Sequence, residues 1–245
     1  MTAERYDPAQ QPEPARGRPP GVFDLAFLTG VAEVTQLLLV RHAQQAVDIR
    51  GPVGELIDPP LSETGRLQAQ LLGEALSTEH IDAVYSSPLR RARETAAGIA
   101  RHHRLEVVIR DDLREVEIWR DIPPDKTAEE FLGADLLRGI RERMLVEKTW
   151  DVYPYSESSA EFRRRCINGI EAIVARHPGE RVVVVCHGGV INAYVGHIIG
   201  SPYDMFFRPA HTAISVVAAG QGRRALHSLN DVHHLRTAEG ELRTH

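Results

Sequence analysis

Cysteine is scarce in this sequence: the 245-residue chain contains two, Cys166 and Cys186. They are too far apart to form a CxxC pair, so the sequence encodes neither a disulfide framework nor a zinc ribbon. Both lie within apolar, periodic segments, which predicts reduced and buried thiols. Unpaired thiols of this kind are usual in a reducing compartment, so we expect a cytoplasmic protein.

An excess of positive charge is also missing, because the net charge of the chain is −5. Proteins that bind nucleic acid or anionic membranes present a positive face, so we expect neither as a partner. No apolar run is long enough to span a bilayer, and we expect a soluble protein that is not exported. A small anionic substrate stays possible, because a few arginines in a cleft outweigh distant surface charge.

Several catalytic motifs are absent from the sequence. The patterns GxxxxGK, GxSxG and HExxH do not occur, which excludes nucleotide-binding P-loops, serine hydrolases of the nucleophile-elbow type and zincins. A cysteine phosphatase is excluded by spacing, because Asn192 stands where a CxxxxxR loop starting at Cys186 requires arginine.

Short apolar runs alternate with helical patterns along most of the chain. This alternation predicts an α/β fold, a three-layer sandwich with a mostly parallel central sheet and helices on both faces. Ligands of such sheets bind beyond the C-terminal ends of the strands. The predicted strands are 36–40, 81–87, 105–110, 181–186, 213–219 and 224–229. Helices are predicted to start at Ser62, at Ser87–Pro88, at the capping box of Thr127 with Glu130, at Ser158 and after His187.

Four regions are expected along the chain. Residues 1–35 begin with a Pro-rich stretch and are expected to form a flexible extension, although 21–35 could add a short element at the domain edge. Residues 36–232 are expected to form the catalytic domain. Within it, 116–156 is less regular and is expected to form a helical insertion over the site. Residues 233–245 are expected to form a polar, mobile tail.

Polar side chains follow the ends of the predicted strands. They are Arg41 and His42, the arginines of "SSPLRRARETA", Glu115, and His187. In a parallel sheet all of them can converge on one edge. Arginine offers a planar fork of donors for phosphate oxygens, a neutral histidine can attack phosphorus, and a carboxylic acid can protonate a leaving alcohol. Gly188 leaves the backbone open to an anion near a helix N-terminus.

Each of these residues also has an ordinary structural explanation. A single histidine at a strand end is more often a hydrogen-bonded structural residue than a catalyst. Arg90 and Arg93 fit a solvated helix face, and Glu115 fits a surface charge. The coincidence of all four signals at matching positions in the topology favours a site for a phosphate monoester.

The same stretches resemble the motifs of a known family. "LLLVRHA" is similar to the strand-end Arg-His-Gly motif of the histidine phosphatase superfamily, in its phosphoglycerate mutase-like branch. "DPPLSETGRLQA", "SSPLRRARETA" and "VVVVCHGGVI" resemble three further motifs of that family. The resemblance runs in order from Gln36 to about Leu229, which is nearly the whole predicted domain.

The resemblance implies a role for each matching residue. His42 would be the nucleophile and would form a phosphohistidine. Arg41, Arg91 and His187 would hold the phosphoryl oxygens, with Arg91 chosen over its neighbour because it directly precedes the motif alanine. Glu115 would protonate the leaving group and then act as base for the attacking water. No metal and no cofactor are implied.

Three positions depart from the family pattern. Ala43 replaces the motif glycine, and Asp48 stands where a phosphate-contacting asparagine is common. A carboxylate would repel a phosphate, so either the loop is displaced or Asp48 points away. The stretch after Glu115 lacks the usual Tyr-Gly continuation, and it also lacks the basic, histidine-containing segment of a phosphoglycerate mutase.

The leading hypothesis is a metal-independent phosphatase that acts on a small phosphorylated metabolite. The alternatives are a mutase, which returns the phosphoryl group to a substrate, and a phosphate-binding protein that turns over poorly. The substrate would be set by 116–156, whose aromatic residues could line an apolar recess but are expected mainly to pack the insertion: Trp119, Trp150, Tyr153 and Tyr155. A homodimer formed through an edge strand is possible.

Overall fold

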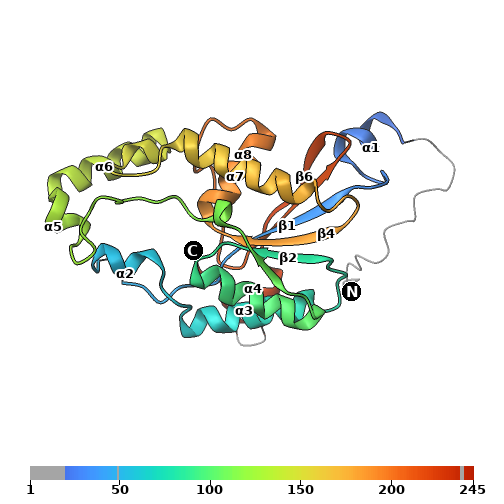
Figure 1. Ribbon diagram of the computed structural model, residues 1–245, viewed down its shortest axis with the longest axis horizontal. Coiled ribbons are helices and arrows are strands. Elements are labelled where there is room, and N and C mark those ends of the chain that lie inside the picture. The colour runs from blue at the N-terminus through green and yellow to red at the C-terminus, as the bar shows by residue number, and fades with distance from the viewer. Residues whose placement is uncertain (1–19, 49, 238–239) are drawn as a thin grey trace, which may run out of the picture.

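One six-stranded sheet runs through the molecule, in the order β3-β2-β4-β1-β5-β6 (Figure 1). The computed structural model describes residues 20–48, 50–237 and 240–245. The first four strands of that order are parallel, while β5 and β6 are antiparallel to their neighbours. The strands are β1 (Thr35–Arg41), β2 (Ala83–Ser86), β3 (Val107–Ile109), β4 (Arg181–Cys186), β5 (Ile214–Gly220) and β6 (Arg223–Asp231).

The central strands are apolar on both faces, because helices cover both sides of the sheet. In β1, Leu37 and Leu39 pack on one side, and Leu38 and Val40 on the other. Helices α7 (Ser159–Val174) and α8 (Gly188–Ile199) cover the first face, and α3 (Glu63–Leu76) and α4 (Arg90–His103) cover the second (Figure 1). The predicted three-layer α/β sandwich is confirmed.

Helix starts follow the predicted caps with one exception, and one predicted helix is divided in two. Ser62 accepts a hydrogen bond from the Gly65 N–H at 2.9 Å and caps α3. The helix predicted from Thr127 is interrupted at Gly133, whose φ of 83° breaks it into α5 (Ala128–Leu132) and α6 (Ala134–Glu147). Helix α4 begins at Arg90 rather than at Ser87–Pro88, because Ser87 is still paired with the sheet.

The insertion forms one end of the molecule together with α2 (Val53–Ile57) (Figure 1). Two short 3₁₀ turns, η2 (Asp111–Leu113) and η3 (Trp150–Val152), lie before and within it. Buried residues of α2 and of most of the insertion pack on one another in a cluster distinct from the two around the sheet: Val53, Trp119, Ile122, Leu137, Ile140 and Val152.

Both outer regions of the described chain contribute residues that pack onto the domain, and within 21–35 they form the short edge element that was one of the two alternatives. Residues 1–19 lie outside the described part, but α1 (Val22–Phe27) is followed by Leu28, which is buried against β5 and β6. Near the C-terminus, Leu235 is fully buried and Leu242 packs on the same cluster. This stretch contains η4 (His233–Leu235), β7 (Arg236–Thr237) and β8 (Gly240–Glu241). No helix in the described residues has the length and apolar character needed to cross a membrane.

Candidate active site

The ends of β1, β2 and β4 lie at one edge of the sheet, as predicted. Arg41 pairs with Cys186 in the parallel register, so His42 and His187 follow at the same level. The His42 N–H donates to the Cys186 carbonyl at 2.9 Å, and the Ser87 N–H donates to the Val185 carbonyl at 3.0 Å. The main chain therefore places two imidazoles side by side, with ring centroids 5.0 Å apart.

One tautomer of His42 is selected by its own backbone. Nδ1 lies 2.8 Å from the Ala43 carbonyl, which can only accept, so Nδ1 carries the proton and Nε2 keeps its lone pair. Burial, followed by the charge of Arg91, lowers the pKa of His42 well below its usual value. The ring is therefore neutral at physiological pH, with Nε2 as a nucleophilic nitrogen.

Two arginines lie beside this nitrogen. Arg91, in the first turn of α4, donates from Nε to His42 Nε2 at 3.3 Å and from Nη1 to the Ile57 carbonyl at 3.0 Å. Arg41 donates from Nη1 to the Pro209 carbonyl at 2.5 Å. Burial lowers the pKa of Arg41 to about 10 and also lowers that of Arg91, yet both stay cationic at neutral pH.

His187 is oriented by Ser87, a contact that the sequence did not reveal. Its Nε2 lies 2.8 Å from Ser87 Oγ, which also accepts from the Leu89 N–H at 3.3 Å. The hydroxyl proton is thus available to Nε2, and Nδ1 of His187 is left as an N–H donor. Burial, followed by the charge of Arg91, lowers the pKa of His187 well below its usual value.

A third histidine, His211, completes the group and was missed in the sequence. Its ring centroid lies 5.6 Å from that of His42, because the antiparallel strand β5 begins beside the end of β1. Nδ1 lies 2.8 Å from Thr244 Oγ1, which accepts from Gln68 Nε2 at 2.8 Å, so Nε2 of His211 is left as the donor. Burial, followed by the charge of Arg41, lowers the pKa of His211 to about 3.

Glu115 lies against the start of α8. Its carboxylate accepts from the Gly189 N–H and from the Val116 N–H, each at 3.1 Å. A Cβ at position 189 would lie 2.3 Å from Glu115 Oε1, so only glycine permits this approach. Burial raises the pKa of Glu115 and outweighs the hydrogen bonds from Gly189 and Val116. The group is thereby suited to carrying a proton.

Three buried nitrogen atoms around His42 have no hydrogen-bond partner among the described residues. They are Arg41 Nε, His187 Nδ1 and His211 Nε2. Buried donors are rarely left unpaired in proteins, and a group of them indicates the place of an acceptor-rich ligand. Gly188 adds to this opening, since a Cβ there would still be 4.0 Å from Arg41 Nε.

Asp48 and Arg90 are not part of this group. Asp48 is exposed, and its carboxylate accepts from the Arg50 N–H at 3.0 Å. Of the two explanations considered for this departure, the structure supports a side chain directed into its own loop. Arg90 is exposed and pairs with Glu94 at 2.6 Å.

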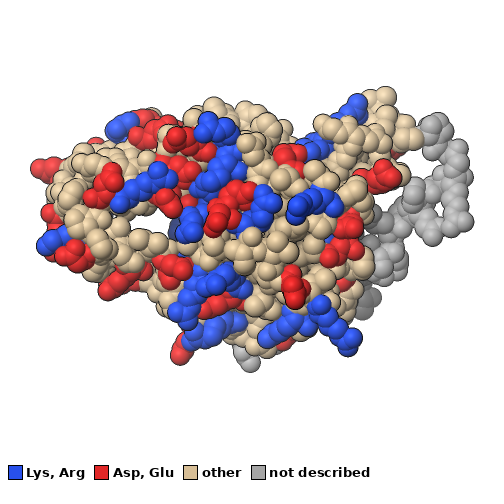
Figure 2. Space-filling view, viewed as in Figure 1, with Lys and Arg blue, Asp and Glu red and all other residues tan. Residues whose placement is uncertain are grey.

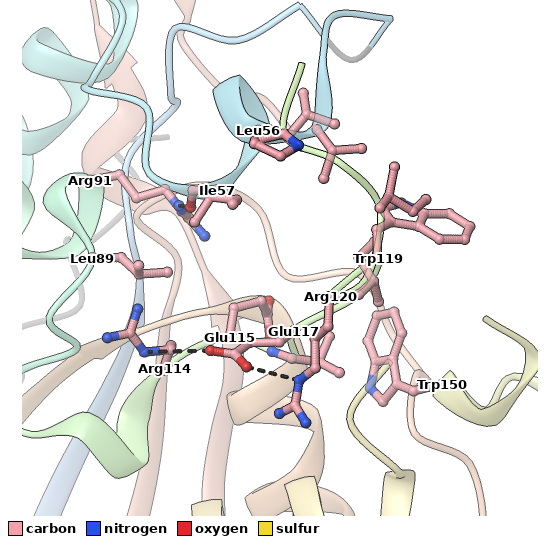
Figure 3. A pocket seen from close by; sticks show the side chains of 15 residues that line it. Leu56, Ile57, Leu89, Arg91, Arg114, Glu115, Glu117, Trp119, Arg120 and Trp150 are labelled. Atoms are coloured by element: carbon pink, nitrogen blue, oxygen red, sulfur yellow. Dashed lines mark hydrogen bonds and ion pairs between the residues drawn. The ribbon is translucent and has the colours of Figure 1, made fainter. Parts of the chain in front are cut away.

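A cavity of about 510 Å³ opens beside Arg91 and Glu115. In Figure 3 the labelled side chains ring an open centre, with Leu56 and Ile57 of α2 across from Trp119 and Trp150. The surface is hollowed near the end of the molecule formed by the insertion and α2, and side chains of both charges lie around the hollow (Figure 2). Trp119 and Trp150 thus line a recess, while Tyr153 packs within the insertion.

Carboxylate, imidazole and thiolate groups are the usual metal ligands in proteins. Within the described residues, no group of three or more His, Cys, Asp or Glu side chains is arranged to hold a metal ion. Cys166 and Cys186 are free, fully buried thiols, as predicted.

Comparison with known proteins places this architecture in a family. Residues 37–232 match the histidine phosphatase superfamily (branch 1). The chain therefore belongs to the histidine phosphatase superfamily, and the resemblance stated from its motifs is confirmed.

Individual relatives extend this result. The chain is 33% identical to phosphoserine phosphatase 1 of Hydrogenobacter thermophilus, over 82% of this chain and 95% of that protein. It is 30% identical to the metal-independent phosphoserine phosphatase of Arabidopsis thaliana, over 83% of this chain and 84% of that protein. Among solved structures, Bacillus stearothermophilus YhfR matches with a TM-score of 0.69 and 27% identity, over 82% of this chain and 98% of that chain.

Proposed function

We propose that this chain hydrolyses small phosphate monoesters through a phosphohistidine formed on His42. The observation that carries the proposal is the group of three unpartnered N–H donors, on Arg41, His187 and His211, around the unprotonated Nε2 of His42. A phosphoryl group supplies the acceptor oxygens that these donors lack, and its negative charge is balanced by Arg41 and Arg91.

In the first step, His42 Nε2 attacks phosphorus and the bond from phosphorus to the ester oxygen breaks. The departing oxygen takes the proton of the Glu115 carboxyl group, so the alcohol leaves neutral. Charge on the transferring oxygens is stabilised by Arg41, Arg91 and His187. Such stabilisation and positioning account for most of catalysis in phosphoryl transfer.

In the second step, water attacks the phosphohistidine on the side that the alcohol has left. The Glu115 carboxylate takes one proton from this water, the nitrogen–phosphorus bond breaks, and inorganic phosphate forms. His42 and Glu115 return to their starting protonation states, so one ester and one water give one alcohol and one phosphate.

A mutase would use the same nitrogen but would return the phosphoryl group to a substrate. The mostly apolar lining beside Glu115, which includes Ile118 and Trp119, suits an alcohol with an apolar group better than the phosphorylated intermediate of a mutase. A silent phosphate-binding protein would not require a carboxyl group with a raised pKa beside the leaving group. A cytoplasmic location and a homodimer formed through an edge strand stay predictions.

The test is phosphate release from phenyl phosphate in the presence of a chelator. We expect turnover by the wild type and a loss of at least about 10⁴-fold in His42→Ala, because no other group replaces the nucleophile. Enzyme quenched during turnover with alkaline detergent should carry phosphate on His42 that is stable in base and labile in acid, in the wild type alone. Activity that survives in His42→Ala would exclude this nucleophile, and a wild type without turnover would favour the mutase or the silent protein.

A further inference from the structure

The cavity beside Glu115 has a composition that bears on the substrate. Its volume of about 510 Å³ lies within the range of pockets that enclose drug-sized ligands. Ten of its fifteen lining residues are apolar. A ligand with only polar groups would leave the apolar surface of the cavity in contact with water, whereas a ligand with an apolar group would remove that surface from water.

The cavity is continuous with the proposed reaction site. Arg91 and Glu115 line it, and the same two residues contact His42 and Gly189. Since Glu115 is the proposed proton donor to the leaving oxygen, the cavity lies on the leaving-group side. An ester with its phosphorus at His42 therefore directs its alcohol past Glu115 and into this space.

The two walls are held at a fixed separation. The Val53 N–H donates to the Lys126 carbonyl at 2.8 Å, and the Gly54 N–H donates to the Pro124 carbonyl at 2.9 Å. A Cβ at position 54 would lie 2.9 Å from Pro124, so α2 and the insertion touch through their backbones. The recess is thus preformed, which lowers the entropic cost of filling it.

The opposite wall is also constrained. Trp119 has a φ of 65°, a conformation that an aromatic residue keeps only when its surroundings hold it. The next N–H, of Arg120, donates to the Tyr155 carbonyl at 2.7 Å. This turn leaves the Trp119 side chain in the apolar cluster and against the cavity.

The polar side of the cavity offers little to a second charged group. Glu117 lies 2.9 Å from Arg120 and 4.0 Å from Arg114, and Figure 3 shows the three side chains joined in a row. Both guanidiniums already have a carboxylate partner, which offsets part of their attraction for a charged substrate group. A small amino-acid ester, with a carboxylate and an ammonium group, would also leave the apolar lining of the cavity uncovered.

We propose that the preferred substrates are phosphate monoesters whose alcohol carries a bulky apolar group, either aromatic or long-chain aliphatic. This group lies between Ile57 on one side and Trp119 and Trp150 on the other. The proposal rests on the proposed hydrolysis at His42, because it assigns the cavity to the leaving alcohol of that reaction.

A series of straight-chain alkyl phosphates, from ethyl to octyl, tests it alongside phosphoserine. The acidity of the alcohol hardly changes along the series, so differences in kcat/KM report contacts with the cavity. We expect kcat/KM to rise by roughly fourfold for each added methylene that is buried, and to exceed that for phosphoserine by about tenfold or more at hexyl.

Ile57→Asp is the informative variant, and Ile199→Asp is its matched control. Both side chains are about half exposed, 56% and 50%, and both lie in the last turn of a helix, but only Ile57 lines the cavity. The main-chain bond from Arg91 to the Ile57 carbonyl does not involve the replaced atoms. The ratio of kcat/KM for the octyl ester to that for the ethyl ester should fall by at least about tenfold in Ile57→Asp. The same ratio should be unchanged in Ile199→Asp.

Calorimetric binding of the matching alkylphosphonates separates this inference from the proposed function. If the enzyme hydrolyses the alkyl phosphates but kcat/KM does not rise with chain length, or if it prefers phosphoserine, the proposed substrate class is wrong and the proposed hydrolysis at His42 still holds. Affinity that rises with chain length without any hydrolysis would support the substrate class and overturn the hydrolase. An affinity that does not change with chain length, together with no hydrolysis, would overturn both the substrate class and the hydrolase.

Discussion

The strand-end edge, defined by Arg41, His42, Ser87 and His187, and the cavity wall, defined by α2 and residues 116–124, face the same space but are built differently. At the edge, backbone pairing of β1, β2 and β4 sets the position of each side chain. At the wall, short helices and turns pack on a small cluster of their own. The residues of the proposed phosphoryl transfer are therefore positioned by the sheet. The residues proposed to select the alcohol of the substrate are positioned by a segment that lies outside the sheet.

Glu115 faces both regions, so changing it tests this division most strongly. Glu115→Gln should lower kcat/KM for an alkyl phosphate by about 10²–10⁴-fold, because the alkoxide cannot leave without a proton. The loss should be much smaller for nitrophenyl phosphate, whose phenolate leaves unprotonated. An equal loss for both esters would contradict proton donation by Glu115.

The pH dependence sharpens the same assignment. The raised pKa keeps Glu115 protonated at higher pH than an ordinary carboxyl group. For the wild type, kcat/KM for the alkyl ester should decline as the pH rises through this pKa, and Glu115→Gln should lack that decline. A decline that persists in the variant would assign it to another group.

Arg90 and Arg91 are adjacent in sequence, but only Arg91 contacts the strand-end edge. Arg91→Ala should lower kcat/KM by about 10²–10³-fold, because it removes a buried cation beside His42 Nε2. Arg90→Ala should stay within about threefold, because its side chain is exposed and paired with Glu94. Steady-state kinetics on phenyl phosphate measure both, and thermal unfolding controls for misfolding. Similar losses in the two variants would contradict the choice of Arg91.

Asp204 tests the support of Trp150, a further residue that lines the cavity, without touching the edge. It is buried and accepts from Ser159 Oγ at 2.5 Å, from the Trp150 N–H at 2.8 Å and from Arg163 Nε at 2.5 Å. Asp204→Ala should lower the free energy of unfolding by about 3 kcal/mol, because it removes the acceptor of the Trp150 N–H and the carboxylate that is paired with Arg163. Urea unfolding measures it, and Asp135→Ala, in an exposed pair with Arg138, should leave the midpoint unchanged.

The stability difference should also depend on pH. Burial alone would raise the pKa of Asp204, but the hydrogen bonds from Ser159 and Arg163 outweigh it and hold the pKa below its usual value. The stabilisation is therefore present above the unfolded pKa of about 3.9 and is lost as the pH falls through the folded pKa. Wild type and Asp204→Ala should converge in acid; a constant difference would show that the effect is not ionic.

The strand-end edge was largely predictable, because each strand and the polar residue after it are adjacent in sequence. The apolar runs before His42 and His187 set the register, and the register set their proximity. The family, the fold class and the assignment as a phosphatase are confirmed by the relatives. The individual catalytic roles stay predictions.

His211 and Ser87 were missed for a physical reason. His211 reaches the site because β5 runs antiparallel to β1, and strand direction is not encoded in a short apolar run. Serine is a common helix cap, so the sequence suggested that role for Ser87. In the structure α4 begins later, at Arg90, and Ser87 contacts β4 and His187 instead. The wall was least predictable, because the contacts of Gly54 and Trp119 depend on two segments that are distant in sequence.

The separate apolar cluster of the wall has a consequence for how such a protein changes over generations. Its buried residues, among them Val53 and Ile122, pack on each other and meet the main core through Ile118. Substitutions there can reshape the recess while the core around the sheet stays intact. Selection can therefore retune substrate preference within one short stretch of the gene, and the inherited strand ends need not change.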